Sequence, residues 1–286
     1  MPQVEISALY LYPVKSMRGI EVDSARLSTL GLDHDRRWMA VRGDGRFVTQ
    51  RDLPALALIE TKLDENGIEL SRVGHGSIVV PHDLPGSEPV FTRVWKDDCE
   101  ALDAGPEWSR WLTSALENTD PLRLVRMAPG YTRPQSRPHD LGAGTTTAFA
   151  DAAPFLVASE ASHAALNREL VTRGLREVPM NRFRPNIVVR GLAAFAEHET
   201  EGLVHPDYKL KFCHPCQRCV VTTIDQDTAH RDPDWQPYRT LCDINPMPDN
   251  PRAPAFGQNA ILEAGEGLAI RTGDPLAIAD SSPSSG

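Results

Sequence analysis

The chain has 286 residues and a formal net charge of −9, with 41% hydrophobic and 24% charged residues. This length allows one large domain or two ordinary ones, and the ordinary composition excludes a disordered or fibrous chain. The acidic balance argues against a nucleic-acid polymer as partner, because such binding requires a basic field. No run approaches the ~20 apolar residues of a membrane span. Glu5 and Pro13 interrupt any signal-peptide core, so we expect a cytoplasmic protein with no membrane contact.

Short strand-like runs separated by turn residues fill the first hundred positions. The apolar run 6–14 comes first, and Asp-Gly at 44–45 and Asn-Gly at 66–67 each separate two further runs, as in β-hairpins. Two more runs follow at 77–80 and 90–94. Many short strands with regularly spaced turns indicate a barrel or a sandwich.

Two helices are predicted among these strands. The first begins at Pro106 and continues through apolar residues at helical spacing. The second follows Ser159, a good helix cap, and ends near Gly174. Residues 129–146, rich in Pro and Gly, predict a long loop or domain boundary. An apolar run covers 154–157. Strands are predicted at 186–189, 220–224, 260–262 and 268–271, with a long irregular stretch over 225–254.

Four of the five cysteines lie within thirty positions of one another: Cys213, Cys216, Cys219 and Cys242. An odd number of cysteines in a cytosolic chain does not indicate a disulfide framework. Two overlapping C-x-x-C spacings with His214 suit a tetrahedral zinc site, although the second C-x-x-C pair of such sites is missing. An iron–sulfur cluster would need a fourth close thiolate. A redox pair or ordinary buried cysteines fit the same spacing, so these readings stay open.

Cys219 differs from the other cysteines by its position. It follows Arg218 and is predicted to open the strand 220–224. A thiolate placed there, beside a cation and loop amides, would serve as a soft metal ligand or as a sulfur nucleophile.

Two short segments offer cations to an anion. Arg182 and Arg184 precede the predicted strand 186–189 and suit bidentate recognition of phosphate or carboxylate. Lys15 and Ser16 follow the first strand, without the Gly-rich loop of a Walker motif. An exposed basic rim and a solvated turn explain the same residues equally well.

Taken in order, several segments resemble one family: 12–16, 35–38, 159–162, 181–186, 218–225, 256–259 and 273–276. The sequence is similar to MOSC proteins with an N-terminal MOSC β-barrel domain, and most similar to the mitochondrial amidoxime-reducing component and its bacterial relatives. The resemblance covers residues 3 to 279. Its most specific string runs from Arg218 and Cys219 through Thr222 and Thr223 to Asp225.

The short-strand pattern and the resemblance both predict a mainly β fold (β/α mixed) with a few helices. The resemblance implies an N-terminal MOSC β-barrel domain over 1–122 and a MOSC β-barrel domain over 123–280. The low-complexity tail, 281–286, is predicted to be disordered.

The resemblance also implies a molybdenum cofactor (Mo-molybdopterin) held between the two domains, with Cys219 as the catalytic metal ligand. The cofactor-binding residues that it implies are Lys15, Ser16, Arg36, Asp151, Ala152, Ala153, Arg184, Asn186, Arg218 and Asn259. Asn259 replaces an aromatic residue of the animal reductases, so the substrate rim is expected to differ. Pyridoxal phosphate binding is a further property associated with the family.

The implied activity is the reduction of small N-hydroxylated molecules. The chain carries no ferredoxin-like segment after the second domain, so a separate flavin, iron–sulfur or haem carrier protein is the expected electron donor. One alternative is a sulfur-carrier or sulfurtransferase protein with a persulfide on Cys219. The absence of a pyridoxal-phosphate domain counts against an autonomous sulfurase. The other alternative is a zinc-binding module built on the clustered cysteines.

Overall fold

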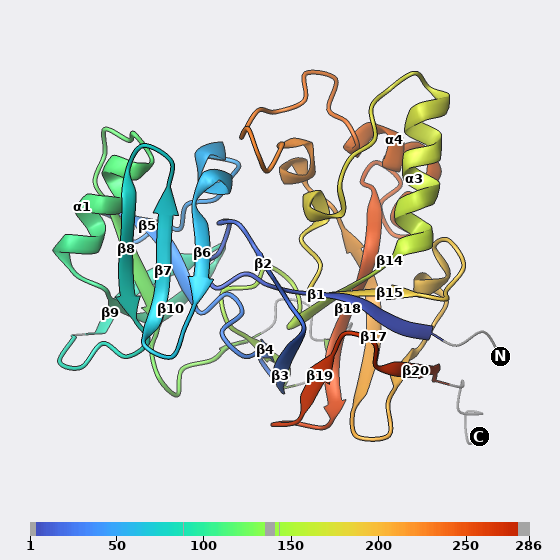
Figure 1. The fold of residues 1–286 in the computed structure, drawn as a ribbon, viewed down its shortest axis with the longest axis horizontal. Coiled ribbons are helices and arrows are strands. Elements are labelled where there is room, and N and C mark those ends of the chain that lie inside the picture. Colours follow the sequence, from blue (N-terminus) through green and yellow to red (C-terminus); the bar gives the residue numbers. More distant parts are fainter. Residues whose placement is uncertain (1–3, 88, 135–140, 143, 280–286) are drawn as a thin grey trace.

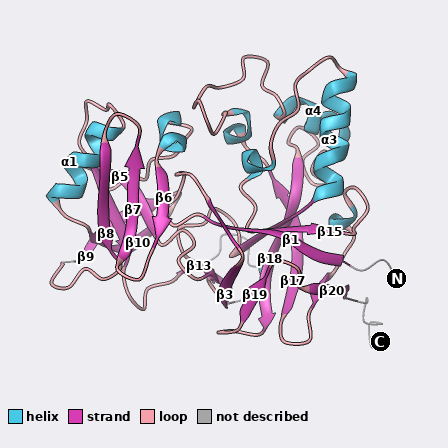
Figure 2. Cartoon of the chain, in the orientation of Figure 1, coloured by secondary structure: helices cyan, strands magenta, loops and turns pink. Residues whose placement is uncertain are grey.

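The computed structural model describes residues 4–87, 89–134, 141–142 and 144–279. The predicted tail 281–286 lies outside the described residues, and the predicted boundary loop 129–146 is described only in part. The described chain is mainly β, which confirms the predicted class (Figures 1 and 2). Its α-helices are α1 (Pro106–Ala115), α3 (Glu160–Thr172) and α4 (Tyr238–Ile244).

A closed seven-stranded barrel forms the lobe that contains most of the second half of the chain. Its hydrogen-bonded order is β15-β14-β18-β17-β16-β20-β1, and β1 pairs back onto β15 to complete the ring. The strands are β1 (Val4–Leu11), β14 (Phe155–Ser159), β15 (Ile187–Arg190), β16 (Gly202–Val204), β17 (Lys209–Gln217), β18 (Ala255–Ala264) and β20 (Pro275–Ile278). Closure leaves no unpaired edge along the ring.

The first strand shows how the sequence fills this barrel. Val4 and Ile6 are fully buried, and after a register shift between Ile6 and Ala8 the buried positions become Leu9 and Leu11. Such a β-bulge changes which residues of a strand face the core. The strand therefore needs no strict alternation to keep its apolar residues inside.

Two sheets and α1 form the other lobe. One sheet has the order β5-β11-β10-β9 and the other β6-β7-β8. The strands are β5 (Trp38–Arg42), β6 (Glu60–Leu63), β7 (Gly67–Arg72), β8 (Gly76–Pro81), β9 (Pro89–Val94), β10 (Asp97–Asp103) and β11 (Leu122–Met127). The hairpin predicted at Asn66 and Gly67 joins β6 to β7, and Pro106 is the first residue of α1.

Short elements connect the two lobes. β2 (Ile20–Val22) pairs with β1, and β3 (Ser24–Ser28) lies between β4 (Gly31–Leu32) and β19 (Ala269–Arg271). β12 (Arg133–Pro134) pairs with β13 (Thr146–Thr147). The N-terminal strands thus pair with strands from the end of the chain, and residues that follow β1 reach the boundary of both lobes. The domain limits 1–122 and 123–280 stay a prediction.

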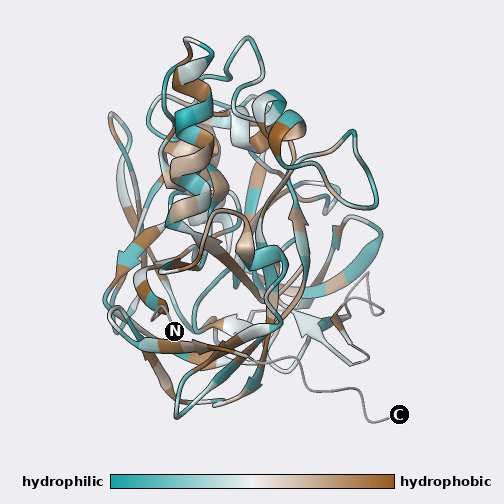
Figure 3. Ribbon diagram, turned by 90° about the vertical axis from the view of Figure 1, so that its right-hand side faces the viewer, coloured by the Kyte–Doolittle hydropathy of each residue, from teal (hydrophilic) through white to brown (hydrophobic). Residues whose placement is uncertain are grey.

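The helix predicted after Ser159 is α3, and the Ser159 side chain accepts a hydrogen bond from the Ala161 amide. Leu166 and Leu170 of α3 are fully buried in a cluster that includes residues of α4 and β18. In Figure 3, brown and teal segments follow one another along this helix, as expected when only one side faces the core.

The predicted strand 220–224 is wrong, because this segment forms a 3-10 helix, η4 (Val220–Thr223). The hydroxyl of Thr222 donates to the carbonyl oxygen of Cys219 over 3.0 Å, and the hydroxyl of Thr223 donates to that of Val220 over 2.7 Å. The β-branched residues favour a strand, but these local bonds and the burial of both threonines stabilise a turn. Cys219 therefore precedes a helical turn and does not open a strand.

Two other expectations need correction. The segment 225–254 is not irregular throughout, because α4 lies within it. The cysteine-rich segment 213–217 is the end of strand β17, whereas no strand was expected there. The remaining 3-10 helices are η1 (Pro54–Leu58), η2 (Met180–Phe183) and η3 (Ala196–His198).

No helix in the described ranges is long and apolar enough to cross a membrane. The cytoplasmic location stays a prediction.

Candidate functional site

One cavity, lined by loops of both lobes, contains every site residue that we predicted. Its lining comes from the loop after β1, the loops on both sides of β5 and the segment that leads into β14. The remaining lining residues belong to η2, the loop between η2 and β15, the end of β17, η4 and the middle of β18. The predicted residues present there are Lys15, Ser16, Arg36, Asp151, Ala152, Ala153, Arg184, Asn186, Arg218, Cys219 and Asn259. The fold thus brings together positions that span most of the sequence, while their individual roles stay predictions.

Lys15 is the buried cation at one side of the cavity. Its Nζ atom lies 2.6 Å from Oδ1 of Asp151 and 2.8 Å from the carbonyl oxygen of Phe149. Burial lowers the pKa of Lys15 to about 8, although Asp151 acts in the opposite direction. Desolvation would raise the pKa of the Asp151 carboxyl, but the charge and hydrogen bond of Lys15 hold it well below its usual range. The pair is therefore ionised at neutral pH.

Two arginines lie over one buried tyrosine ring. The guanidinium carbons of Arg36 and Arg184 are 4.7 and 4.3 Å from the ring centroid of Tyr12. Arg36 is fixed by Asp35, 2.5 Å away, and by Oδ1 of Asn186 at 3.1 Å. Burial lowers the pKa of Arg184 to about 10, so this guanidinium still carries its charge at neutral pH. Stacking and ion pairing hold both cations in place.

Three of the lining residues have left-handed backbone conformations. The φ angles are 68° at Ser16, 47° at Arg36 and 53° at Arg184. This region costs a residue with a side chain roughly 1–2 kcal/mol, and such strain gathers at functional sites. The surrounding fold imposes these conformations and so fixes the direction of three polar side chains.

Among the described residues that line the cavity, two buried guanidinium atoms have no hydrogen-bond partner: Nη2 of Arg184 and Nε of Arg218. Other atoms of the same groups are bonded, with Nη1 of Arg184 donating to the Met17 carbonyl and Nη2 of Arg218 to that of Phe183, both over 2.7 Å. An unpartnered buried donor costs about 1–3 kcal/mol. An anionic ligand in the cavity would satisfy both atoms.

Cys219 places a partly exposed sulfur at the same cavity. Nη2 of Arg51 lies 3.3 Å from its Sγ atom. The Arg51 guanidinium lies over the ring of Trp95, 4.7 Å from its centroid. Trp95 in turn donates from Nε1 to Oδ1 of Asp151 over 3.1 Å. Side chains of the β-sheet lobe thus surround the thiol.

Sequence reasoning missed several lining residues: Thr49, Arg51, Ala150, Leu156, Phe183, Cys216, Gln217 and Val221. Cys216, Gln217 and Val221 lie within three positions of Cys219, and that proximity was a usable signal. Thr49 and Arg51 come from a loop far away in the sequence and belong to no motif.

The cysteines that cluster in the sequence do not form a metal site in the described structure, although Cys216 and Cys219 line the same cavity. None of the five cysteines forms a disulfide, and no group of three or more His, Cys, Asp and Glu side chains in the described structure suits a metal ion. Cys213 and Cys216 lie along β17, where each residue advances the chain by about 3.3 Å, whereas a zinc site needs a tight turn. The geometry gives no support to the zinc-binding alternative.

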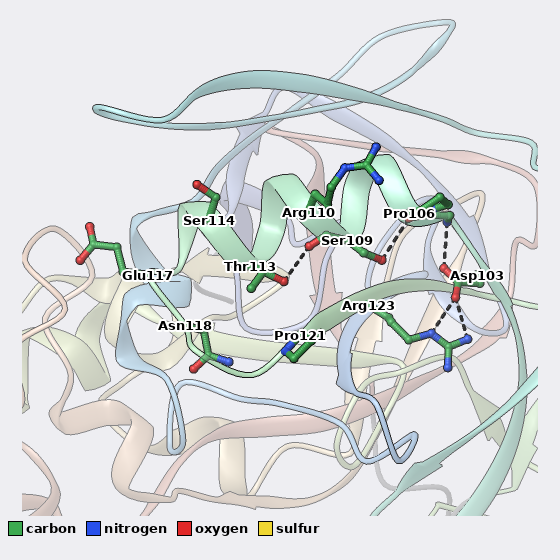
Figure 4. A pocket seen from close by; sticks show the side chains of 11 residues that line it. Asp103, Pro106, Ser109, Arg110, Thr113, Ser114, Glu117, Asn118, Pro121 and Arg123 are labelled. Carbon is green, nitrogen blue, oxygen red and sulfur yellow. Dashed lines mark hydrogen bonds and ion pairs between the residues drawn. The ribbon is translucent and has the colours of Figure 1, made fainter.

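A second hollow runs along α1 (Figure 4). Its charged residues Asp103 and Arg123 pair with each other over 2.6 Å, and its Ser109 and Thr113 hydroxyls donate to backbone carbonyls of the helix region. It contains neither a cysteine nor a histidine. Its lining therefore has no thiol and no imidazole that could act as a soft metal ligand or a redox group.

The comparisons with known proteins agree with this architecture. Residues 3–119 match the MOSC N-terminal beta barrel domain, and residues 144–277 match the MOSC domain. Human mitochondrial amidoxime-reducing component 1 is 34% identical over 285 residues, which cover 95% of this chain and 82% of that protein. Mitochondrial amidoxime reducing component 2 of Bos taurus is 34% identical over 283 residues, with 95% and 82% covered. The Xenopus laevis component 1 is 33% identical, with 95% and 81% covered.

These similarities extend across both lobes and across the loops that line the cavity. The chain belongs to the family of the mitochondrial amidoxime-reducing components, in which a MOSC N-terminal β-barrel domain precedes a MOSC domain.

Proposed function

We propose that this protein is a molybdenum-cofactor oxidoreductase that reduces N-hydroxylated compounds. The observation that carries the proposal is one cavity lined both by several cations and by the partly exposed Cys219. The names of the relatives, which are amidoxime-reducing components, support the same activity.

The chemistry of the cavity suits this cofactor. The cations Lys15, Arg36 and Arg184 would hold its phosphate, and the unpartnered Nη2 atom of Arg184 is a donor that such a group would satisfy. The Cys219 thiolate would bind the metal as a soft ligand. The remaining proposed contacts are Ser16, Asp151, Ala152, Ala153, Asn186, Arg218 and Asn259.

When bound, the cofactor would supply the two-electron redox chemistry that cleavage of the N–O bond requires. The net reaction consumes two electrons and two protons, replaces the N–OH group by N–H, and releases one water. A separate flavin, iron–sulfur or haem protein would supply the electrons. This chain's own residues hold the cofactor by its phosphate, fix the position of the sulfur, and keep charged groups around the reacting nitrogen.

The test is to purify the protein from cells that make the cofactor and to measure two quantities. Elemental analysis gives molybdenum per chain, and reduction of benzamidoxime by an artificial electron donor gives activity. We expect Cys219→Ala to lose both and Cys242→Ala, a cysteine of α4 outside the cavity, to keep both. A Cys219→Ala protein with normal molybdenum content and full activity would overturn the proposal.

The sulfur-carrier alternative has one observation in its favour. The Arg51 guanidinium beside Sγ of Cys219 would equally stabilise a persulfide anion. Mass spectrometry that finds an added sulfur atom on Cys219 in protein without molybdenum would favour this function over the reductase.

A further inference from the structure

Arg51 is the cation whose guanidinium contacts the proposed metal ligand, Cys219. It belongs to none of the segments that resemble the family. We propose that its charge makes the cavity bind neutral N-hydroxylated substrates in preference to their cationic reduced products. Arg51 would thus be a specificity-determining residue that promotes product release. This inference rests on the proposed reductase function.

The cavity has a large excess of positive charge. Five cations line it, Lys15, Arg36, Arg51, Arg184 and Arg218, against the single carboxylate of Asp151. The Asp151 charge is matched by Lys15 at 2.6 Å, and the Arg36 charge by Asp35, outside the lining, at 2.5 Å. No carboxylate in the described ranges lies within ion-pair distance of Arg51. Burial lowers the pKa of its guanidinium, but the nearby Cys219, Asp151 and Asp52 raise it overall.

Arg51 is also held in place. Its guanidinium lies over the Trp95 ring, and its Nη2 atom lies 3.3 Å from Sγ of Cys219. Trp95 is itself fixed by its hydrogen bond to Asp151 and by an edge contact with Phe47, whose ring centroid is 5.1 Å away. The charge therefore has a defined position beside the sulfur, and it cannot move away from a ligand that reacts there without breaking this stack.

The other cations have different surroundings. Lys15, Arg36 and Arg184 are the groups proposed to hold the cofactor phosphate, which would offset their charge, and Nη1 of Arg218 lies 2.9 Å from Sγ of Cys216. Arg51 comes from the loop after β5, and its Nη2 atom is within hydrogen-bond distance of Sγ of Cys219. Its charge would therefore lie next to the nitrogen of a bound substrate or product.

Reduction changes the charge of the reacting molecule. The hydroxyl oxygen of an N-hydroxylated amidine or guanidine withdraws electrons, so the compound is a weak base and is neutral near pH 7. Its reduced product is a strong base, which takes a further proton from solvent and becomes a cation. A fixed guanidinium at close range repels this cation and leaves the neutral substrate almost unaffected. The same reasoning predicts that permanently cationic N-hydroxylated compounds are poor substrates.

The experiment compares two ligands of the same shape and different charge in the molybdenum-loaded enzyme. Benzamidine is the cationic product of benzamidoxime reduction, and benzamide is its neutral isostere. Inhibition constants are measured during benzamidoxime reduction, and dissociation constants are measured by calorimetry without turnover. In Arg51→Gln we expect benzamidine to bind about tenfold tighter relative to benzamide, the effect of removing one nearby charge in a partly solvated site.

Two controls isolate the charge. Arg51→Lys keeps the charge and should keep the wild-type ratio of the two affinities. Arg46→Gln removes an exposed arginine that pairs with Asp44 on the outside of the same lobe, and it should leave the ratio unchanged. In the wild type, added salt should tighten benzamidine binding and leave benzamide binding unaffected.

The outcomes separate this inference from the proposed function. A wild-type protein that binds molybdenum but does not reduce benzamidoxime contradicts the proposed function. An active wild type with an unchanged ratio in Arg51→Gln overturns the role of Arg51. If Arg51→Gln fails to bind the cofactor, the salt experiment on the wild type decides. A ratio of benzamidine to benzamide affinity that does not change with added salt then overturns the role of Arg51.

Discussion

The two sides of the cavity are built differently. On the side of Lys15, Arg36 and Arg184, the lysine and the Tyr12 ring under the two partly exposed arginines are buried, and both arginines have left-handed backbones. On the side of Arg51 and Trp95, the side chains are partly exposed and are held by ring stacking. A strained, buried arrangement suits a ligand that stays bound, whereas an exposed one suits ligands that come and go.

This difference assigns separate tasks to the two sides. We infer that the cations around Lys15 and Tyr12 determine whether the cofactor binds, and that the side of Arg51 and Trp95 determines which small molecule binds next to it. Substitutions on the two sides should then affect different measurements.

Arg184→Gln should have the largest effect. It removes a buried charge and the unpartnered Nη2 donor proposed to hold the cofactor phosphate. We expect molybdenum per chain to fall at least about tenfold, since a charge-assisted hydrogen bond to a buried group contributes roughly 1.5–3 kcal/mol. Arg190→Gln, at the exposed end of β15, is the matched control and should load normally. Normal molybdenum content in Arg184→Gln would refute the division.

The Lys15–Asp151 pair predicts a pH dependence of stability. The ordinary pKa of lysine is 10.5, and burial lowers that of Lys15 to about 8. Between these values the unfolded chain binds more protons than the folded protein, so the free energy of unfolding contributed by this group rises with pH. The expected gain is of the order of 1–3 kcal/mol. Denaturant unfolding of the cofactor-free protein over this pH range measures it.

Lys15→Met should remove that rise, and Lys209→Met, an exposed lysine of β17, should retain it. On the acid side the sign is reversed for Asp151. Its pKa is held below the usual range, so its contribution is present above the ordinary carboxyl pKa and is lost as the pH falls. A wild type whose stability does not increase in the alkaline range would show that Lys15 keeps its proton there.

The sequence predicted the fold class, because many short strands carry that pattern. The short segments that resemble the family also contain the residues that line the cavity around Lys15, and the roles of these residues stay predictions. Lys15 follows the first strand, and Arg184 lies in a segment that the resemblance covers as a whole. It did not predict Arg51 or Trp95, since their position depends on how the loops of one lobe approach the other. Local patterns do not report contacts between segments that are distant in sequence.

The same limit explains the error at 220–224. The intrinsic preference of Val220, Val221, Thr222 and Thr223 is for a strand, but the native turn buries both threonine hydroxyls and bonds them locally. Thr222→Val should therefore destabilise the protein by about 1–2 kcal/mol although it increases strand propensity. Thr172→Val removes a similar hydroxyl-to-carbonyl bond at an exposed helix end and should cost much less. If both substitutions lower the free energy of unfolding equally, the hydroxyl bonds of the turn stabilise the protein no more than the bond at the exposed helix end.

Trp95→Phe should have the smallest effect. It distinguishes most clearly between a role in cofactor binding and a role in small-molecule binding. The smaller ring can still stack under the Arg51 guanidinium, but it cannot donate to Asp151. We expect stability to change by less than about 1 kcal/mol, because the lost bond is partly exposed, and molybdenum content to stay normal. The benzamidine-to-benzamide affinity ratio should shift in the same direction as in Arg51→Gln, but by a smaller factor, since the charge is retained and only its position loosens.

Trp235→Phe, at another exposed loop, should change none of these quantities. If Trp95→Phe instead lost molybdenum and kept the affinity ratio, the exposed side would belong to the cofactor site and not to the small-molecule site.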